Sequence, residues 1–308
     1  MDDTKTPLVS VVMNCRNGER FVRETIDSVL LQTMSDLELV FWDNRSTDST
    51  AEIVKGYEDP RIRYLLSDSD DTLGQARNRA LAEATGRWVA FLDSDDIWYP
   101  DFLERQLSLL DETGASMVYS NAFSFYPDGR EVLHTGGRGS EVEEVDYRQL
   151  AFEYDICISA TVFERRVLSE LTYVVDPDLM AGEEADLFIR IASLRRTVFN
   201  PAVLARYRVH SSSDTWINSE NFIHDARKMM QNFEKLGLDT TAVRDGMLEA
   251  AYWTAAMSSW MKRDGERARQ HLRAMRGKRL RRHVLFCLTF LPYGLVSPLL
   301  RLAGKRAP

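Results

Sequence analysis

Carboxylates dominate one short segment of this chain, and it is the segment best suited to chemistry. Asp93, Asp95 and Asp96 follow directly after the apolar run 88–92. Carboxylates crowded in this way repel one another and raise each other's pKa. A divalent cation removes that repulsion, and hard oxygen ligands suit Mg²⁺ or Mn²⁺. The same residues also fit an acidic loop that caps the next helix, so this segment alone leaves both interpretations open.

Three more polar clusters stand at the ends of predicted elements. They are the turn 14–18 after one apolar run, Asp43 after a second, and the group Glu183, Glu184 and Asp186 at the start of a helical pattern. Acidic residues in the first turn of a helix are favoured by its dipole, but three carboxylates exceed what a cap needs. Functional roles therefore have to be considered for these clusters as well.

The apolar pattern of the first hundred residues predicts strands that alternate with helices. The strands are 8–13, 37–42, 61–66 and 88–92, and the helices run from 19 to 33, from 49 onward and from 74 to 84. Ser49 and Glu52 have the spacing of a capping box, and Gly86 suits the end of the third helix. Four such alternations predict a right-handed, mostly parallel, doubly wound α/β sheet. Ligands bind at the carboxyl ends of strands in such sheets.

The second half of the chain predicts a mixed arrangement followed by helices. The expected elements are a helix at 100–110, a strand at 117–121, a hairpin around 127–129, a helix at 147–152, a strand at 158–163 and a last strand at 203–210. We therefore expect a catalytic domain over residues 7–213 and a helical C-terminal extension over 214–308.

Composition limits the class of partner. The chain has 308 residues and a net charge of -8, which argues against a dedicated nucleic-acid binder. Its three cysteines lie far apart, so neither a zinc site nor a disulfide framework is indicated, and a reducing compartment is expected. The polar start runs straight into a strand and no signal peptide is visible, so we expect a cytoplasmic protein.

The C-terminal segment 278–306 combines basic and apolar residues. Basic residues dominate 262–282, and 284–300 is apolar except for Thr289 and Ser297. That run is shorter than the roughly 20 residues of a spanning helix. We expect it to lie on or re-enter the inner face of the cytoplasmic membrane, held to anionic lipid by its basic residues. The alternative is a C-terminal helix that packs on the protein's own core.

Six segments, taken together and in order, resemble the family 2 glycosyltransferases of the GT-A fold. They are SVVMNCRN at 10–17, WDNRSTD at 42–48, GQARN at 74–78, FLDSDD at 91–96, GEEADLFIR at 182–190 and YRVH at 207–210. Two positions depart from the family pattern: Asn14 stands where a proline is usual, and Glu184 stands where the family has an aspartate. The resemblance implies a nucleotide-binding half and a mixed acceptor half.

The resemblance also implies roles for individual residues. Asp43 would bind the edge of a uracil or a comparable base, with capping of the next helix as its alternative role. Asp93 would hold the ribose and Asp95 the metal ion, Mn²⁺ or Mg²⁺, while Asp96 would be a helix cap. His210 would reach the metal or the diphosphate, or would be structural. The remaining residues assigned to the nucleotide-sugar are Asn14, Asn17, Arg77 and Ser94.

Arg77 and Glu184 carry further alternatives. Arg77 would support the acidic loop, face the diphosphate or lie on the surface. Glu184 would be the catalytic base that takes the proton of an acceptor hydroxyl, unless Glu183 shares the task. One base is enough, because the departing diphosphate needs a metal ion rather than a proton donor.

The resemblance therefore implies an inverting, metal-dependent glycosyltransferase. It would move a sugar from a nucleotide-diphospho-sugar, expected to be a UDP-sugar, to a saccharide or a lipid-linked saccharide, in surface polysaccharide or glycolipid synthesis. The departures at Asn14 and Glu184 leave a second hypothesis, a nucleotide-sugar-binding protein without turnover. A sugar-phosphate nucleotidyltransferase is disfavoured, because residues 14–20 contain one glycine where a glycine-rich phosphate loop is needed.

Overall fold

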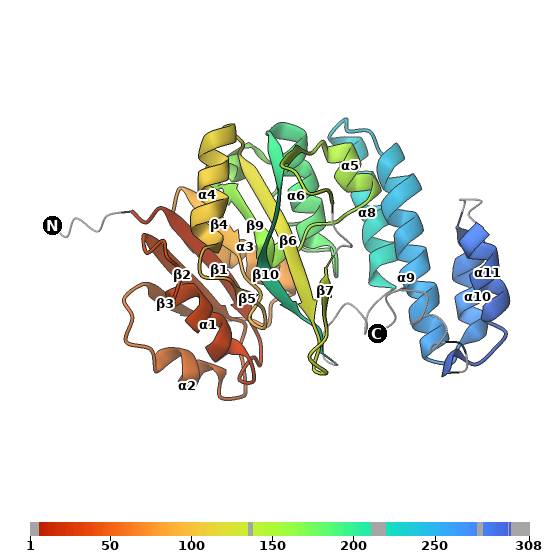
Figure 1. Ribbon diagram of the computed structural model, residues 1–308, viewed down its shortest axis with the longest axis horizontal. Helices are drawn as coiled ribbons and strands as arrows, with labels where there is room; N and C mark the ends of the chain where they lie inside the picture. The colour runs from red at the N-terminus through yellow and green to blue at the C-terminus, as the bar shows by residue number, and fades with distance from the viewer. Residues whose placement is uncertain (1–5, 135–137, 211–219, 276–279, 295, 297–308) are drawn as a thin grey trace. The chain divides into compact units, whose positions relative to one another are not determined.

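The computed structural model describes residues 6–134, 138–210, 220–275, 280–294 and 296 (Figure 1). The chain divides into two compact units. The first comprises 1–150, 154–178 and 183–211, and the second comprises 151–153, 179–182 and 212–308.

The first unit is built on one mixed sheet. Its strand order is β3 (Ile62–Leu66), β2 (Leu37–Asp43), β1 (Val9–Cys15), β4 (Trp88–Phe91), β9 (Thr161–Glu164), β6 (Met117–Phe125), β10 (Thr197–Arg208) and β5 (Ile97–Trp98). The first four strands are mutually parallel. Strand β9 is antiparallel to both β4 and β6, whereas β6 and β10 are parallel. The predicted fold class, a parallel nucleotide-binding half joined to a mixed half, is confirmed.

Helices alternate with the strands of the parallel half. They are α1 (Val22–Leu30), α2 (Thr50–Lys55) and α3 (Leu73–Glu83), and α4 (Phe102–Thr113), α5 (Tyr147–Phe152) and α6 (Glu183–Leu194) follow later in the chain. Every residue of β2 is buried, as is expected for a strand with both faces covered. The apolar side chains of β1, β2 and α1 belong to one core cluster, which also includes residues of β4 and α4. The strand ends that carry the polar clusters are thereby held on a rigid support.

Two short strands lie beside the main order of the sheet. Strand β7 (Glu131–Leu133) is antiparallel to β6, which confirms the predicted hairpin, and β8 (Glu143–Glu144) is antiparallel to β10. The last strand begins at Thr197, earlier than the predicted 203–210, and the strand predicted at 158–163 opens with a 3₁₀ turn, Ile158–Ala160. A second 3₁₀ segment, Arg165–Glu170, follows β9.

The capping box predicted at Ser49 and the helix end predicted at Gly86 are both wrong. The side chain of Ser49 makes no capping bond, and Asp48 Oδ1 instead accepts from the Thr50 amide at 3.0 Å. A capping box is present at the start of α3, between Thr72 and Gln75. Gly86 does not end α3. A Cβ at Gly86 would lie 2.6 Å from the amide nitrogen of Ser10, so the glycine permits the close approach of this turn to β1.

The second unit is helical, as predicted for the C-terminal extension. Its elements are α8 (Asn221–Lys235), a π-helical turn (Val243–Met247), α9 (Leu248–Met261), α10 (Gly265–Ala274) and α11 (Leu280–Leu288). Trp260 lies at the centre of its core, 5.2 Å from the ring of Tyr293. The buried Asp225 accepts hydrogen bonds from the amides of residues 180, 181 and 182, at 3.0, 2.7 and 2.9 Å.

The predicted membrane segment 278–306 lies partly outside the described residues. Where it is described, Leu285 and Val296 are buried in the core of the second unit, while Val284, Phe290 and Leu291 are exposed. No helix among the described residues is long and apolar enough to cross a membrane. One face of this segment therefore packs on the unit's own core and the other presents apolar side chains.

Candidate active site

The acidic loop follows β4 at the centre of the sheet, and its third carboxylate is structural. Asp96 is fully buried; its Oδ2 accepts from Ser159 Oγ at 2.5 Å and its Oδ1 accepts from the Arg208 amide at 2.8 Å. The predicted cap role is wrong, because β5 follows Asp96 and the N-cap position of α4 is Asp101. Burial and the nearby Asp95 and Asp93 charges raise the pKa of Asp96 well above its usual range.

Asp95 and His210 meet at the open side of this loop. His210 Nε2 and Asp95 Oδ2 are 2.7 Å apart, and the Asp95 side chain is 31% exposed. The imidazole is held by the ring of Phe21, with centroids 5.1 Å apart, and Arg208 Nε donates to the carbonyl oxygen of Asp95 at 2.7 Å. Residues far apart in the sequence thus form one pair of oxygen and nitrogen donors.

This pair fits a divalent ion that takes its other ligands from a substrate. Among the described residues, no group of three or more His, Cys, Asp or Glu side chains is arranged to hold a metal. Mg²⁺ is commonly bound through one or two protein ligands together with substrate phosphates and water. The Asp95 carboxylate is a ligand that suits Mn²⁺ and Mg²⁺, and the His210 imidazole beside it is a nitrogen ligand that the hard Mg²⁺ accepts less readily.

Arg77 joins the acidic loop to the second acidic cluster. Its guanidinium, on a side chain only 6% exposed, donates to Asp93 Oδ1 at 3.3 Å, to Glu184 Oε2 at 3.5 Å and, more closely, to Glu183 Oε1. Burial acts to lower the pKa of Arg77, but the three carboxylates more than reverse this and raise it. Of the three interpretations of Arg77, support of the acidic groups matches its contacts, and a surface location is excluded.

The neighbours of Arg77 on α3 show why its motif has this spacing. A Cβ at Gly74 would lie 3.3 Å from the Asp176 carbonyl oxygen, so the helix packs tightly on the segment 175–177. The side-chain amide of Asn78 donates to the Val175 carbonyl oxygen and accepts from the Val175 amide, each at 2.9 Å. One turn of α3 therefore fixes the chain that leads into α6 while it presents Arg77 to the carboxylates.

The three carboxylates that open α6 differ in exposure. Asp186 is fully buried and accepts from Arg190 at 2.7 Å, and the side chain of Glu183 is 1% exposed. Glu184 is the open one, with a side chain 21% exposed. Burial, together with the charge of Glu183, raises the pKa of Glu184 to about 8 although Arg77 acts in the opposite direction. Glu184 is thus the carboxyl in this cluster best suited to exchange a proton with a ligand.

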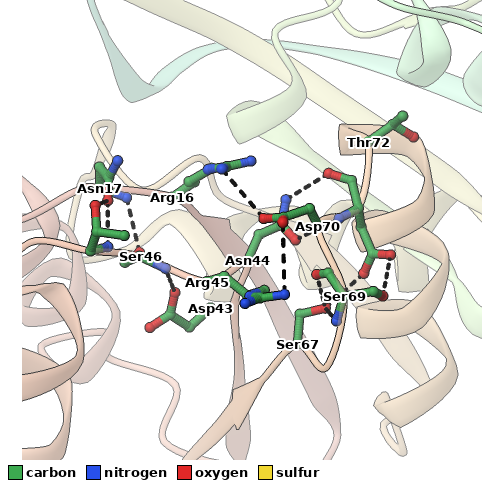
Figure 2. A network of polar contacts seen from close by, with 12 residues as sticks. Arg16, Asn17, Asp43, Asn44, Arg45, Ser46, Ser67, Ser69, Asp70 and Thr72 are labelled. Carbon is green, nitrogen blue, oxygen red and sulfur yellow. Dashed lines mark hydrogen bonds and ion pairs between the residues drawn. The ribbon is translucent and has the colours of Figure 1, made fainter.

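The residues at or after the ends of β1 and β2 that are predicted to bind the nucleotide make hydrogen bonds within the loops at the ends of these two strands. Asp43 is fully buried; its Oδ1 accepts from the Ser46 amide at 2.7 Å and its Oδ2 accepts from the Tyr64 hydroxyl at 2.7 Å. Its alternative role as a cap of the next helix is wrong, because α2 begins at Thr50 and its N-cap is Ser49. Asn17, in a left-handed conformation with φ of 58°, accepts from the Thr47 amide at 2.8 Å. Figure 2 shows these loops side by side.

The loop after β3 continues this network. Figure 2 shows Arg16 and Arg45 both directed at Asp70, at 3.5 and 3.7 Å, while Asn44 binds the backbone of Asp71. Ser94 accepts from Thr25 through its carbonyl oxygen at 3.0 Å, and Asn14 has a buried amide nitrogen without a hydrogen-bond partner among the described residues. The ends of β1, β2 and β3 thus form one continuous polar rim.

Two residues of this site, Ser159 and Tyr154, lie outside the six segments that resemble the family, and Arg208 lies within the segment 207–210 without a role predicted for it. Ser159 accepts from the Asp93 amide at 3.1 Å and donates to Asp96. The hydroxyl of Tyr154 is buried and has no hydrogen-bond partner in the described parts of the chain. A local sequence pattern could not reveal either residue, because their partners are distant in the chain.

A parallel nucleotide-binding sheet whose central strand ends in an acidic loop defines a class, the GT-A glycosyltransferases. The sequence model described as "Glycosyl transferase family 2" matches residues 10–172, more than half of the chain. The chain belongs to this family.

Relatives and solved structures agree with this assignment. The chain is 33% identical over 176 residues to WfgD of Escherichia coli, a "UDP-Glc:alpha-D-GlcNAc-diphosphoundecaprenol beta-1,3-glucosyltransferase", covering 56% of this chain and 65% of WfgD. It is 38% identical over 125 residues to the "Putative teichuronic acid biosynthesis glycosyltransferase TuaG" of Bacillus subtilis, covering 40% of this chain and 50% of TuaG. The match thus spans half to two thirds of the length of these relatives.

Two solved structures share the fold. S. aureus TarS in complex with UDP-GlcNAc superposes with a TM-score of 0.67 at 18% identity, covering 87% of this chain and 81% of that one. The mannosyltransferase PcManGT from Pyrobaculum calidifontis, in complex with GDP-Man and Mn²⁺, superposes with a TM-score of 0.60 at 17% identity, covering 98% and 89%.

Proposed function

We propose that this protein is an inverting, metal-dependent glycosyltransferase that uses a UDP-sugar to extend a lipid-linked saccharide in surface polysaccharide or glycolipid synthesis. The observation that carries the proposal is the pairing of Asp95 with His210 at 2.7 Å, in the same acidic loop as Asp93, which Arg77 links to the partly exposed Glu184. A cation-binding pair and a proton acceptor next to one another are the two groups that such a transfer needs.

The donor nucleotide lies along the rim formed by β1, β2 and the acidic loop. Asp43 would accept from the base edge only if its buried carboxylate exchanged the Tyr64 hydroxyl for the base, Asp93 binds the ribose, and Asn14, Asn17 and Ser94 line the remaining surface. The buried amide of Asn14, which has no partner among the described residues, supports this placement. Arg77 acts through the carboxylates that it holds and need not touch the donor.

Asp95 and His210 hold the cation, Mn²⁺ or Mg²⁺. When bound, the cation offsets the negative charge that grows on the diphosphate as it departs. Arg208 keeps Asp95 in place through its backbone, and Phe21 keeps the imidazole in place. Mn²⁺ in the solved mannosyltransferase complex is in line with this ion choice.

Glu184 takes the proton of the acceptor hydroxyl as that oxygen attacks the anomeric carbon. The new C–O bond forms on the face opposite to the breaking bond, and the nucleoside diphosphate leaves with the bonding electron pair. The raised pKa of Glu184 makes it a stronger base once it is ionised, so we expect transfer to increase as pH rises through about 8. Glu183, which is almost fully buried against Arg77, holds the guanidinium and does not share the task.

Two observations support a lipid-linked acceptor at the cytoplasmic face of the membrane. WfgD, by its printed name, acts on a GlcNAc-diphosphoundecaprenol. The C-terminal segment presents Val284, Phe290 and Leu291 outward within a region rich in arginine. We infer peripheral contact through these side chains.

A donor screen tests the proposal. Thermal shifts are measured with MnCl₂ and a series of UDP- and GDP-sugars, and each stabilising donor is then assayed for transfer to GlcNAc-α-diphosphate carrying an undecyl chain. We expect a UDP-sugar to raise the melting temperature only with MnCl₂ present, and sugar transfer to follow. Stabilisation without transfer or hydrolysis would favour the alternative of a binding protein without turnover, and no stabilisation by any donor would contradict the proposal.

A further inference from the structure

Asp225, on α8, is a buried carboxylate that binds three successive backbone amides. Its side chain is 2% exposed, and its Oδ2 accepts from the amides of Met180, Ala181 and Gly182 at 3.0, 2.7 and 2.9 Å. Its Oδ1 lies 3.0 Å from Nδ1 of His224. A buried charge is costly unless hydrogen bonds satisfy it, and hydrogen bonds to an ionised acceptor are about twice as strong as neutral ones. Three such bonds to one oxygen therefore hold this backbone firmly.

The backbone held by Asp225 leads directly into the helix of the proposed base. Residues 179–182 belong to the second unit together with α8, although the chain before and after them belongs to the first unit. Helix α6 begins at Glu183, the residue after Gly182, and Glu184 is its second residue. The last amide that Asp225 binds thus lies two positions before Glu184 in the chain.

The side chains of the segment before α6 contribute unevenly to its placement. Asn78 of α3 holds the backbone at Val175, five residues before the first of the three amides. Beyond that point Leu179 is buried, but Met180 is 51% exposed and Gly182 has no side chain. The hydrogen bonds to the carboxylate on α8 therefore provide the anchor immediately before the helix begins.

We propose that Asp225 is a positioning residue for sugar transfer, which fixes the backbone entering α6 and thereby sets where the Glu184 carboxylate meets the acceptor hydroxyl. Displacement of a catalytic group by about 1 Å can lower a rate about 100-fold. Asp225 acts through the backbone and is not itself a catalytic group. The helical unit then contributes to catalysis although the base and the cation-binding pair belong to the first unit. The inference rests on the proposed function, in which Glu184 is the base.

The test compares two variants of Asp225 with a control variant in the same unit. The control is Asp264→Ala, because Asp264 is also a carboxylate that binds a backbone amide, that of Arg267 at 2.9 Å, at the start of α10. The donor is UDP-glucose or another sugar found in the screen, and the acceptor is GlcNAc-α-diphosphate carrying an undecyl chain. Donor-binding sites are counted by calorimetry, so that kcat refers to folded protein only.

We expect a graded loss of kcat at Asp225. Asp225→Ala removes all three backbone bonds and should lower kcat about 100-fold, whereas Asp225→Asn keeps an oxygen acceptor without the charge and should lower it about tenfold. The Kd for the donor should stay within twofold of wild type in both. Asp264→Ala should lower the melting temperature but leave kcat within twofold. If Asp225→Ala does not fold, Asp225→Asn alone decides the comparison.

A double-mutant cycle with Glu184 separates positioning from a purely structural role. If Asp225 acts through the base, Asp225→Asn should cost about tenfold in kcat in the wild-type background but less than about twofold in the Glu184→Gln background. Equal costs in both backgrounds, or a wild-type kcat in both Asp225 variants, would overturn the inference and leave the proposed function intact. A wild-type protein that neither transfers nor hydrolyses any donor would overturn the proposed function, and this inference with it.

Discussion

The two acidic clusters of the site each have one buried carboxylate but differ in how Arg77 and solvent meet the others. The buried member, bonded to the protein, is Asp96 in the first cluster and Asp186 in the second. Arg77 contacts Asp93 in the first cluster and both Glu183 and Glu184 in the second. Asp93 and Asp95 are 36% and 31% exposed, whereas in the second cluster Glu184 is 21% exposed and Glu183 is buried.

The surroundings of Asp95 and Glu184 account for their different chemistry. Asp95 faces an imidazole, which adds a nitrogen donor. Burial and the charge of Glu183 raise the pKa of Glu184, although Arg77 acts in the opposite direction. Position in a sequence cluster therefore does not decide what a carboxylate does. The group that the fold brings to its open side decides it.

The largest effect is expected at Asp95. Asp95→Asn removes the charge from the cation-binding pair and should lower transfer at least about 1,000-fold. Sugar transfer with MnCl₂ is the measurement. Asp96→Asn is the matched control, because its carboxyl already has a strongly raised pKa and is turned into the protein. It should keep activity within a few-fold, and equal losses in both variants would contradict the division of roles.

The second largest effect is expected at Glu184. Glu184→Gln cannot accept a proton and should lower kcat roughly 100- to 1,000-fold. The Kd for the UDP-sugar, measured by calorimetry, should stay near the wild-type value since the donor side is unchanged. Full activity in Glu184→Gln together with inactivity in Glu183→Gln would move the base to Glu183.

A change of stability rather than of chemistry is expected at the buried member of the second cluster. Asp186→Ala leaves Arg190, which is 2% exposed, without its ion partner. The free energy of unfolding should fall by about 3–5 kcal/mol, measured by urea denaturation. Glu170→Ala, which removes a half-exposed partner of Arg195, should cost less than about 1 kcal/mol. Similar losses in the two variants would show that burial does not distinguish these pairs.

The smallest effect is a pH dependence of stability. The pKa values of Asp93, Asp96 and Glu184 are raised in the folded chain, chiefly by burial, so the folded state binds protons more tightly than the unfolded one. Their contribution is fully present below the unfolded pKa near 4 and is lost as pH rises through the folded values, about 8 for Glu184. Without metal, the melting temperature should fall by about 5 °C between pH 5 and 8.

Two further measurements, one with MnCl₂ and one on a variant, test the origin of this fall in melting temperature. MnCl₂ should reduce it, because a cation stabilises the ionised carboxylates, and Glu184→Gln should reduce it by removing one of the three groups. A melting temperature that rises over this pH range in the absence of metal would contradict the assignment.

The sequence predicts the parallel half of the sheet well because its apolar runs are uninterrupted and lie between strong turn signals. It also predicts which strand ends carry polar residues, since strand direction places them at one edge. It fails for Asp96, whose partners Ser159 and Arg208 come from later elements, and for Ser49, where Asp48 competes successfully for the helix amides. Tyr154 could not be predicted, because nothing in its own neighbourhood indicates that its hydroxyl is left without a partner.

The contacts that assemble the site join residues that lie far apart in the sequence and are therefore synthesised at different times. Arg77 and Glu183 are 106 residues apart, Asp96 and Arg208 are 112 apart, and Asp95 and His210 are 115 apart. Such distant contacts form late in folding. During synthesis the first four strands can therefore pair while the acidic loop still lacks its imidazole, and a chain released before residue 210 would have a nucleotide fold without a complete reaction centre.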